Sequence, residues 1–340
     1  MAALPRASSP LQQLAQAFEA GRYAEVISLA EALAGQAPGS PEPLRYLAAA
    51  LVESGDLERA AATYAQALKR APTDLQLLLG ASEQLICIPG EDREAIAEGL
   101  RLCEQGRRLA QKTGREALHF EFLLLEGIAC NQLGEGAQAL GCLEQALRLS
   151  PRSAEALIER AVALFELCRF EQSRECLLRA LQQSASEPSA HYYLGLLAER
   201  GGQRREAQRC FERARSLSPE EFPRPVELSE EAFDAAVLEA VALLPSQVTG
   251  TLDHTTLAVE QVPSDEDLLA ESPPLSPLIL GVFRSGGEPL QTAIVLYQRN
   301  LERFARTREE LVEQIAITLM HEVGHLMGLG EEDLWERGLE

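Results

Sequence analysis

The chain has 340 residues, 46% of them hydrophobic and 24% charged, which is an ordinary balance for a soluble globular protein of about two domains. The formal net charge is −21, and residues 221–340 alone carry −16, with 7 Arg, no Lys and 23 acidic side chains. So negative a field repels phosphate backbones, and we therefore expect no nucleic-acid partner. It could favour basic peptides, although acidity alone often reflects only solubility.

The N-terminal residues 1–16 contain no basic start followed by an apolar core, and no stretch of the chain has the length of a membrane span. The seven cysteines show no C-x-x-C pairing and have apolar neighbours, as reduced core thiols do. They all precede residue 220: Cys87, Cys103, Cys130, Cys142, Cys168, Cys176 and Cys210. We expect a cytoplasmic protein without a membrane partner.

Residues 1–220 repeat with a period of 34, the spacing of paired antiparallel helices that stack on the next pair. The clearest unit is 41–74, and the units that begin at Phe120 and Pro188 carry large and small residues at the same offsets. The segment 75–114 is longer than one unit, so we predict one repeat with an insertion between its helices. In total the sequence predicts five to six repeats.

Small residues at the eighth and twentieth positions of each unit allow paired helices to approach closely, and bulky residues fill the remaining gaps. This recurrence resembles the tetratricopeptide repeat. The resemblance implies an all-α superhelix over residues 1–220, whose concave groove binds an extended peptide or a helix of a protein partner. The sequence identifies neither that partner nor whether the repeats would recruit a substrate or inhibit the rest of the chain.

A domain boundary is predicted near residue 220, because Phe-Pro-Arg-Pro at 222–225 interrupts the helical pattern. The second domain, 221–340, begins with a predicted helix over 229–244, where apolar residues recur at helical spacing. A small twisted sheet follows, because three apolar runs have the length of strands. These runs are 255–262, 278–283 and 293–297.

Some residues between and beside these strands have two interpretations. The acidic, proline-rich connection 263–277 is interpreted as a surface loop, with the border of a substrate cleft as the alternative. His254, near a predicted turn, and Tyr297, at a strand end, could contact a metal or a substrate. Ordinary packing is the favoured interpretation of Tyr297, and a contact to the metal or the transition state is the minor interpretation of His254.

The C-terminal part of the chain predicts one long buried helix. Thr307 with Glu310 three residues on forms a capping box, and the helix can run without Pro or Gly through Val323. Residues 311–320 are apolar on most sides, which indicates burial inside a domain. Polar side chains on such a helix need partners.

This helix contains His321-Glu322-Val323-Gly324-His325, the H-E-x-x-H spacing. One helical turn separates His321 from His325, so both imidazoles can bind one metal ion, with Glu322 beside it. Gly328 is a natural helix end, after which the chain can turn back toward the metal. The residues that arrive there, 331–333, are all acidic.

The order H-E-x-x-H-x-x-G-x-x-E resembles the zincin metallopeptidases, in particular small bacterial zincin-like peptidases with an acidic third ligand. The likeness covers residues 225–340 and implies a minimal α+β zincin-like domain that binds one Zn²⁺ per chain. It assigns the metal ligands to His321, His325 and Glu331, with Asp333 as the alternative third ligand. The third His ligand of the metzincins is excluded, because no His follows His325.

The resemblance implies a zinc-dependent peptidase that acts on a peptide or protein substrate. Glu322 would be the general base, which takes a proton from water as the substrate carbonyl is attacked and passes it to the leaving amine. In zincin-like folds an exposed strand edge usually aligns the peptide. The alternative is an adaptor in which the repeats bind a protein and the zincin-like module is inactive or only structural. The intact Glu322 favours the enzyme.

Overall fold

The computed structural model of the protein describes residues 9–37, 39–88, 92–252, 255–284 and 293–330. Contacts divide the chain into two compact units, Met1–Ala163 and Leu164–Glu340, and the division falls inside helix α9 (Ala154–Glu166). The domain boundary near residue 220 stays a prediction. Within the described residues, no helix combines the length and the apolar character that a membrane span requires.

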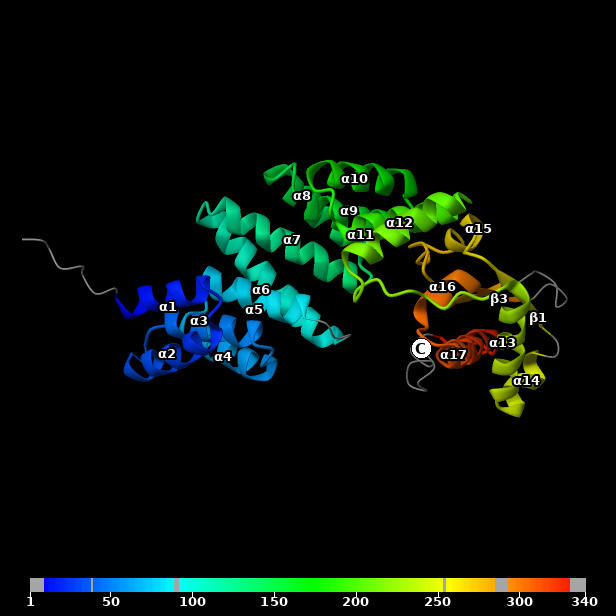
Figure 1. Cartoon of the computed structure of the whole chain (residues 1–340), viewed down its shortest axis with the longest axis horizontal. Helices are drawn as coiled ribbons and strands as arrows, with labels where there is room; N and C mark the ends of the chain where they lie inside the picture. Colours follow the sequence, from blue (N-terminus) through cyan, green and yellow to red (C-terminus); the bar gives the residue numbers. More distant parts are fainter. Residues whose placement is uncertain (1–8, 38, 89–91, 253–254, 285–292, 331–340) are drawn as a thin grey trace, which may run out of the picture. The chain divides into compact units, whose positions relative to one another are not determined.

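The first unit consists of antiparallel helices joined by short turns (Figure 1). Two helices occupy the long segment 75–114, as the sequence predicts. The bounds before α9 are α1 (Pro10–Glu19), α2 (Tyr23–Gln36), α3 (Glu42–Glu53), α4 (Leu57–Arg70), α5 (Leu75–Cys87), α6 (Arg93–Lys112), α7 (Glu116–Gln132) and α8 (Gly136–Leu149).

Close helix approach depends on small residues, as the repeat pattern predicts. A Cβ atom added at Gly127 of α7 would lie 2.5 Å from Leu143 Cγ of α8. In the second unit, a Cβ at Gly195 would lie 2.6 Å from Phe211 Cε1. Non-bonded carbon atoms prefer about 3.5–4.0 Å, so neither position accepts a larger residue without a shift of the paired helix.

The second unit contains the last repeat helices and a small α+β domain. The repeat helices are α10 (Phe170–Gln183), α11 (Pro188–Arg200) and α12 (Arg204–Leu217). The α+β domain contains α13 (Glu230–Leu243), α14 (Ser246–Leu252), β1 (Thr256–Glu260), α15 (Asp265–Leu268), β2 (Gly281–Arg284), β3 (Ala293–Tyr297), α16 (Gln298–Phe304) and α17 (Arg308–Leu326). The predicted helix over 229–244 and the three predicted strands are confirmed, although β2 begins three residues late.

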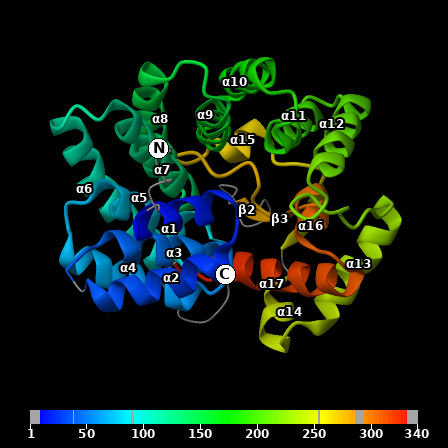
Figure 2. The ribbon, with the colours of Figure 1, turned by 60° about the vertical axis from the view of Figure 1, so that its left-hand side comes forward.

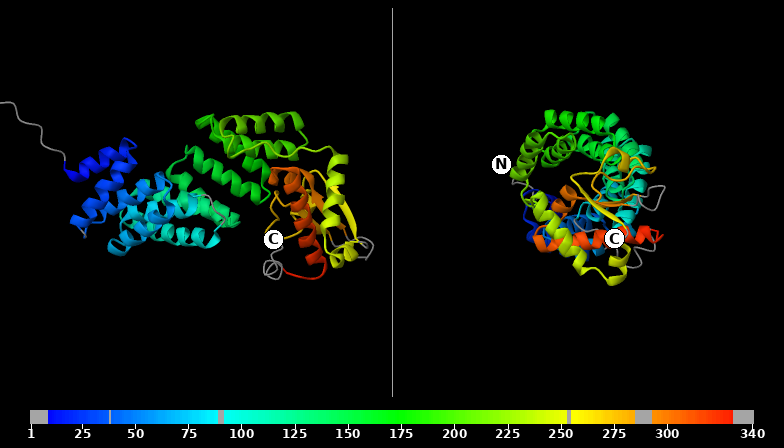
Figure 3. Two further views of the ribbon diagram at one scale, coloured as in Figure 1. Left: turned by 60° about the horizontal axis from the view of Figure 1, so that its bottom comes forward. Right: turned by 90° about the vertical axis from the view of Figure 1, so that its right-hand side faces the viewer.

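The three strands form one sheet in the order β1-β3-β2. Central strand β3 runs parallel to β1 and antiparallel to β2, so β2 is an edge strand. One face of the sheet shares an apolar core with α13 and α17, which lie beside each other in Figure 2. The opposite face is turned toward α10–α12, and the right-hand view of Figure 3 shows the strands between these helices and α17.

Candidate metal centre

Helix α17 begins with the cap that the sequence predicts, in a slightly different form. Thr307 Oγ1 accepts a hydrogen bond from the backbone N–H of Glu310 at 3.1 Å. The Glu310 carboxylate reaches one residue further back than a capping box requires and accepts from the N–H of Arg306 at 2.8 Å. Both bonds satisfy backbone donors that have no intrahelical partner, and they fix the start of the helix.

The other end of α17 is closed by a Schellman turn around Gly328, which has a φ of +81°. The N–H of Gly328 donates to the His325 carbonyl at 2.9 Å, and the N–H of Leu329 donates to the Gly324 carbonyl at 3.0 Å. The helix therefore stops where the sequence predicts. The turn also brings the Leu329 carbonyl back beside the motif.

The two motif histidines point at a common position. Their Nε2 atoms are 3.0 Å apart, and their ring planes meet at 81° with centroids 4.7 Å apart. Two nitrogens bound to one tetrahedral zinc at about 2.0–2.1 Å would be separated by about 3.3 Å. The spacing and the imidazole donors of His321 and His325 thus fit a shared metal ion.

The orientation of His325 is supported through its second ring nitrogen. Its Nδ1 lies 3.3 Å from the Leu329 carbonyl oxygen. When Nδ1 carries the ring proton, it donates to this carbonyl, and the Nε2 lone pair is left for a metal. The C-terminal turn of α17 therefore does more than end the helix, because it also favours the tautomer of His325 that can act as a ligand.

Glu322 of α17 is 6% exposed, and its side chain lies beside Gly281, the first residue of strand β2. A Cβ atom at Gly281 would be 3.5 Å from Glu322 Cγ and only 2.8 Å from Thr318 Cγ2, so the strand approaches the helix closely here. The sequence interpretation assigned no role to Gly281. A glycine within an apolar strand is a sign of such a close approach.

The third ligand lies beyond the described residues. The assigned Glu331 and its alternative Asp333 belong to 331–340, and His254 is also outside the described part of the chain. Among the described residues, no group of three or more His, Cys, Asp or Glu side chains could hold a metal. The structure therefore brings together two of the three predicted ligands, and the third stays a prediction.

Comparison with protein families gives a match on each side of the predicted boundary. The zincin-like metallopeptidase family matches residues 252–339, and two tetratricopeptide-repeat families match 17–85, 132–199 and 188–221. The chain carries tetratricopeptide repeats and a zincin-like metallopeptidase domain. The predicted fold class, all-α repeats followed by a small α+β zincin-like domain, is thereby confirmed. None of the curated proteins compared with the chain matches it.

Solved structures that resemble the chain show the repeat fold. The type IV pilus biogenesis factor PilW has a TM-score of 0.53 and 15% identity, over 66% of this chain and 96% of its own. The pilF protein of Pseudomonas aeruginosa has a TM-score of 0.52 and 17% identity, over 66% of this chain and 95% of its own. At such identities the likeness concerns the fold alone.

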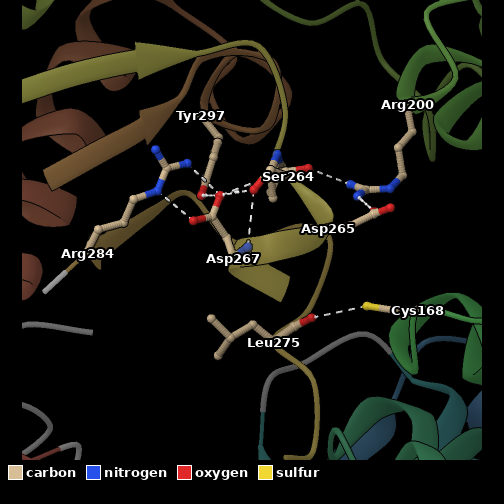
Figure 4. A network of polar contacts seen from close by, with 9 residues as sticks. Cys168, Arg200, Ser264, Asp265, Asp267, Leu275, Arg284 and Tyr297 are labelled. Atoms are coloured by element: carbon tan, nitrogen blue, oxygen red, sulfur yellow. Dashed lines mark hydrogen bonds and ion pairs between the residues drawn. The ribbon is translucent and has the colours of Figure 1, made fainter. Parts of the chain in front are cut away.

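The sheet face opposite α17 carries a polar network of the zincin-like domain, drawn in Figure 4. Arg284 of β2 donates from Nε and Nη2 to the two carboxylate oxygens of Asp267, each at 2.6 Å. Ser264 Oγ and Tyr297 Oη also donate to Asp267, at 2.6 and 2.9 Å. Burial would raise the pKa of Asp267, but these hydrogen bonds outweigh it and hold the pKa well below its usual value.

Tyr297 is therefore a structural residue of the zincin-like domain. Its side chain is fully buried, and its hydroxyl donates a hydrogen bond to Asp267 on the sheet face turned away from α17. Burial and the neighbouring Asp267 carboxylate both raise the pKa of Tyr297, which keeps the hydroxyl protonated. The packing interpretation of Tyr297 is confirmed, because its buried hydroxyl is bonded to Asp267.

The connection 263–277 links the zincin-like domain to the last repeat helices. Arg200 of α11 donates to the Pro263 carbonyl at 2.7 Å and pairs with Asp265 (Figure 4). The adjacent Glu199 pairs with Arg303 of α16. The connection therefore lies between the repeat helices and the polar face of the sheet, away from α17. The alternative in which it borders a cleft at the motif gains no support from this position.

Proposed function

We propose that the chain is a zinc-dependent peptidase that hydrolyses peptide bonds with a water molecule activated at the metal. Its metal ligands are His321, His325 and Glu331, with Asp333 as the alternative third ligand, and Glu322 is the general base. The observation that carries the proposal is the convergence of two Nε2 atoms, 3.0 Å apart, on a helix whose intervening Glu322 is buried. The match to the zincin-like metallopeptidase family supports it.

Zinc, when bound, would lower the pKa of water toward neutrality and polarise the substrate carbonyl. The chain supplies the remaining parts of the reaction. His321 and His325 hold the ion through Nε2, and the Leu329 carbonyl orients His325. Glu322 accepts the proton that water loses and transfers it to the leaving amine.

Strand β2 is the element best placed to align the substrate. Among the described strands it pairs only with β3, along one edge, and it begins beside Glu322. A peptide that added to its other edge would gain backbone hydrogen bonds without any demand on its sequence, as in other cases of strand addition. Its scissile bond would then lie along the helix that carries the motif.

The tetratricopeptide repeats are proposed to recruit a protein substrate or another protein partner. Repeats of this kind present an extended concave surface, and each repeat can add a few contacts to one long segment. We place this activity in the cytoplasm. The seven cysteines show no C-x-x-C pairing and have apolar neighbours, which supports a reducing compartment.

The test measures metal and cleavage separately. Purified protein should contain about one zinc per chain. Glu322→Gln should retain that zinc and lose cleavage of casein or a peptide library by about 10²–10⁴-fold, since general base catalysis contributes about that much. Glu313→Gln is the matched control, because Glu313 is exposed on the same helix. Zinc without any cleavage in the unaltered protein would favour the adaptor.

The third ligand needs its own pair of variants. Glu331→Ala should reduce bound zinc to well under half an equivalent, and Asp333→Ala should leave it near one. Zinc content is measured after dialysis against a weak chelator. If only Asp333→Ala loses the metal, Asp333 is the ligand and the assignment to Glu331 is wrong.

A further inference from the structure

Strand β2 is a short strand that pairs with β3 over its whole length and packs against the apolar core through Phe283. It is four residues long and lies at the edge of the sheet that the described strands form, with β3 on one side. Its first residue, Gly281, lies against Thr318 and Glu322 of α17 with no side chain of its own. No side chain at this end anchors β2 to the helix, so beyond its pairing with β3 and the packing of Phe283 the position of β2 relative to Glu322 depends on what holds its other end.

That other end is Arg284, which is held by two carboxylates from different elements. It makes a bidentate ion pair with Asp267 and a further bond of 2.8 Å from Nη1 to Glu260 of β1. The Asp267 side chain is 5% exposed and the Arg284 side chain 36% exposed. Planar, bidentate pairing fixes both the distance and the direction of the guanidinium, which a point charge does not.

The carboxylate that receives Arg284 is itself fixed. Asp267 closes a capping box with Ser264 at the start of α15, so its backbone and side chain are both held. At the start of α15, Arg200 of α11 binds the Pro263 carbonyl and pairs with Asp265, and its guanidinium lies 4.4 Å from the centre of the Phe170 ring. The support of β2 thus continues into the last repeat helices, within the second unit.

We propose that Arg284 is a positioning residue that holds strand β2 beside Glu322, and that Arg200 of the last repeat extends this support. The inference deepens the proposed function, because it matters for catalysis only if β2 aligns the substrate. Stability alone would not require such a network, since apolar residues of similar volume often serve as well as a buried ion pair. Fixed orientation is what the charged network adds.

The first experiment measures amide hydrogen exchange in the full-length chain. Arg284→Met should raise the exchange rates of residues 281–284 by tenfold or more, while interior amides of α13 and α17 change less than about twofold. Arg284→Lys keeps the positive charge but loses the planar guanidinium that pairs at two points, so it should give an intermediate exchange rate. Arg308→Met is the control, since Arg308 makes an exposed ion pair with Glu239 in the same domain.

The second experiment measures steady-state cleavage of a peptide substrate. Arg284→Met should raise KM about five- to tenfold and change kcat less than about threefold, because the aligned strand is misplaced while the motif helix is not. A merely structural role would reduce the fraction of folded enzyme, which lowers kcat and leaves KM unchanged. Arg200→Met should shift KM in the same direction by about twofold.

The outcomes separate this inference from the proposed peptidase activity. If exchange in Arg284→Met rises equally in β2, α13 and α17, or does not rise in β2, the positioning role is overturned. If Arg200→Met leaves β2 exchange unchanged, the contribution of the repeat is overturned. If the unaltered zinc-loaded protein cleaves nothing, the proposed function fails, and the exchange rates still decide whether Arg284 holds the strand.

Discussion

The two faces of the three-stranded sheet are stabilised in different ways. Toward α13 and α17 the strands present only apolar side chains, such as Ile294 and Leu296, which are fully buried. Toward α15 they present Arg284, Tyr297 and Glu260, joined through charges and hydrogen bonds. Apolar burial is strong but has no direction, whereas the charged face is weaker and directional. Helix α17 is thus held by apolar burial, and the edge strand β2 beside it is held by directional hydrogen bonds and ion pairs.

The largest effect is expected on the apolar face. Leu319 of α17 is fully buried two residues before His321, and Leu319→Ala would leave a cavity in this core. The free energy of unfolding should fall by about 3 kcal/mol. Urea denaturation followed by circular dichroism measures it, with Leu238→Ala as the control, because Leu238 is an exposed residue of α13 and the change should stay under about 0.5 kcal/mol. A loss below about 1 kcal/mol for Leu319→Ala would contradict the view that burial dominates this face.

A smaller, pH-dependent effect is expected on the polar face. Asp267→Asn removes the charge that pairs with Arg284, and at pH 7 the free energy of unfolding should fall by about 2 kcal/mol. The pKa of Asp267 is depressed in the folded state, so its stabilisation is present above the unfolded pKa of about 3.9 and is lost as pH falls below it. The difference between Asp267→Asn and the unaltered protein should therefore be constant from pH 5 to 7 and shrink below pH 4.

The control for this titration is Asp234→Asn, because Asp234 is exposed on α13. Its free energy of unfolding should differ from that of the unaltered protein by less than about 0.5 kcal/mol at any pH in the series. A difference for Asp267→Asn that does not shrink toward acid pH would show that the charge of Asp267 is not what stabilises this face.

The smallest effect is expected for Tyr297→Phe. The ring keeps its buried position and only the hydrogen bond to Asp267 is lost, so the free energy of unfolding should fall by about 1 kcal/mol. Zinc content should not change, because the hydroxyl lies on the face opposite α17. A loss of zinc or of kcat in Tyr297→Phe, measured with the folded fraction unchanged, would restore Tyr297 as a residue of the reaction.

The elements that could be predicted from the sequence are those with strong local patterns. The 34-residue period predicts the helix pairs, the apolar run 293–297 is strand β3, and Thr307 with Gly328 marks the ends of α17 within two residues. The H-E-x-x-H spacing alone brings His321 and His325 together, because residues four apart lie one turn apart on the same face of a helix.

The polar face could not be predicted for the opposite reason. Asp267 and Arg284 are 17 residues apart, and Asp267 and Tyr297 are 30 apart, so no local pattern links them. Helix α15 has four residues, too few for a periodic signal. The role of Gly281 also depends on a contact between a strand and a helix that lie far apart in the chain. Such contacts follow from tertiary packing, which a single sequence does not reveal.

One turn between repeat helices differs from its equivalents. The turns α1–α2, α3–α4, α7–α8 and α11–α12 each place a glycine at a φ between 68° and 78°, whereas Cys168 takes this place in α9–α10 at 56°. A left-handed conformation costs a non-glycine residue about 1 kcal/mol. Here the thiol lies 3.8 Å from the carbonyl oxygen of Leu275, in the connection 263–277.

This turn separates hairpins that differ in how freely a whole repeat can be gained or lost. The hairpins α1–α2, α3–α4 and α7–α8, before Cys168, share the same glycine turn, as expected of repeats that can be duplicated or deleted as whole units. The last two hairpins, α9–α10 and α11–α12, carry Cys168, Glu199 and Arg200, whose partners belong to the α+β domain. Relatives of this chain are therefore expected to vary in repeat number at the N-terminal end while they keep the last two hairpins.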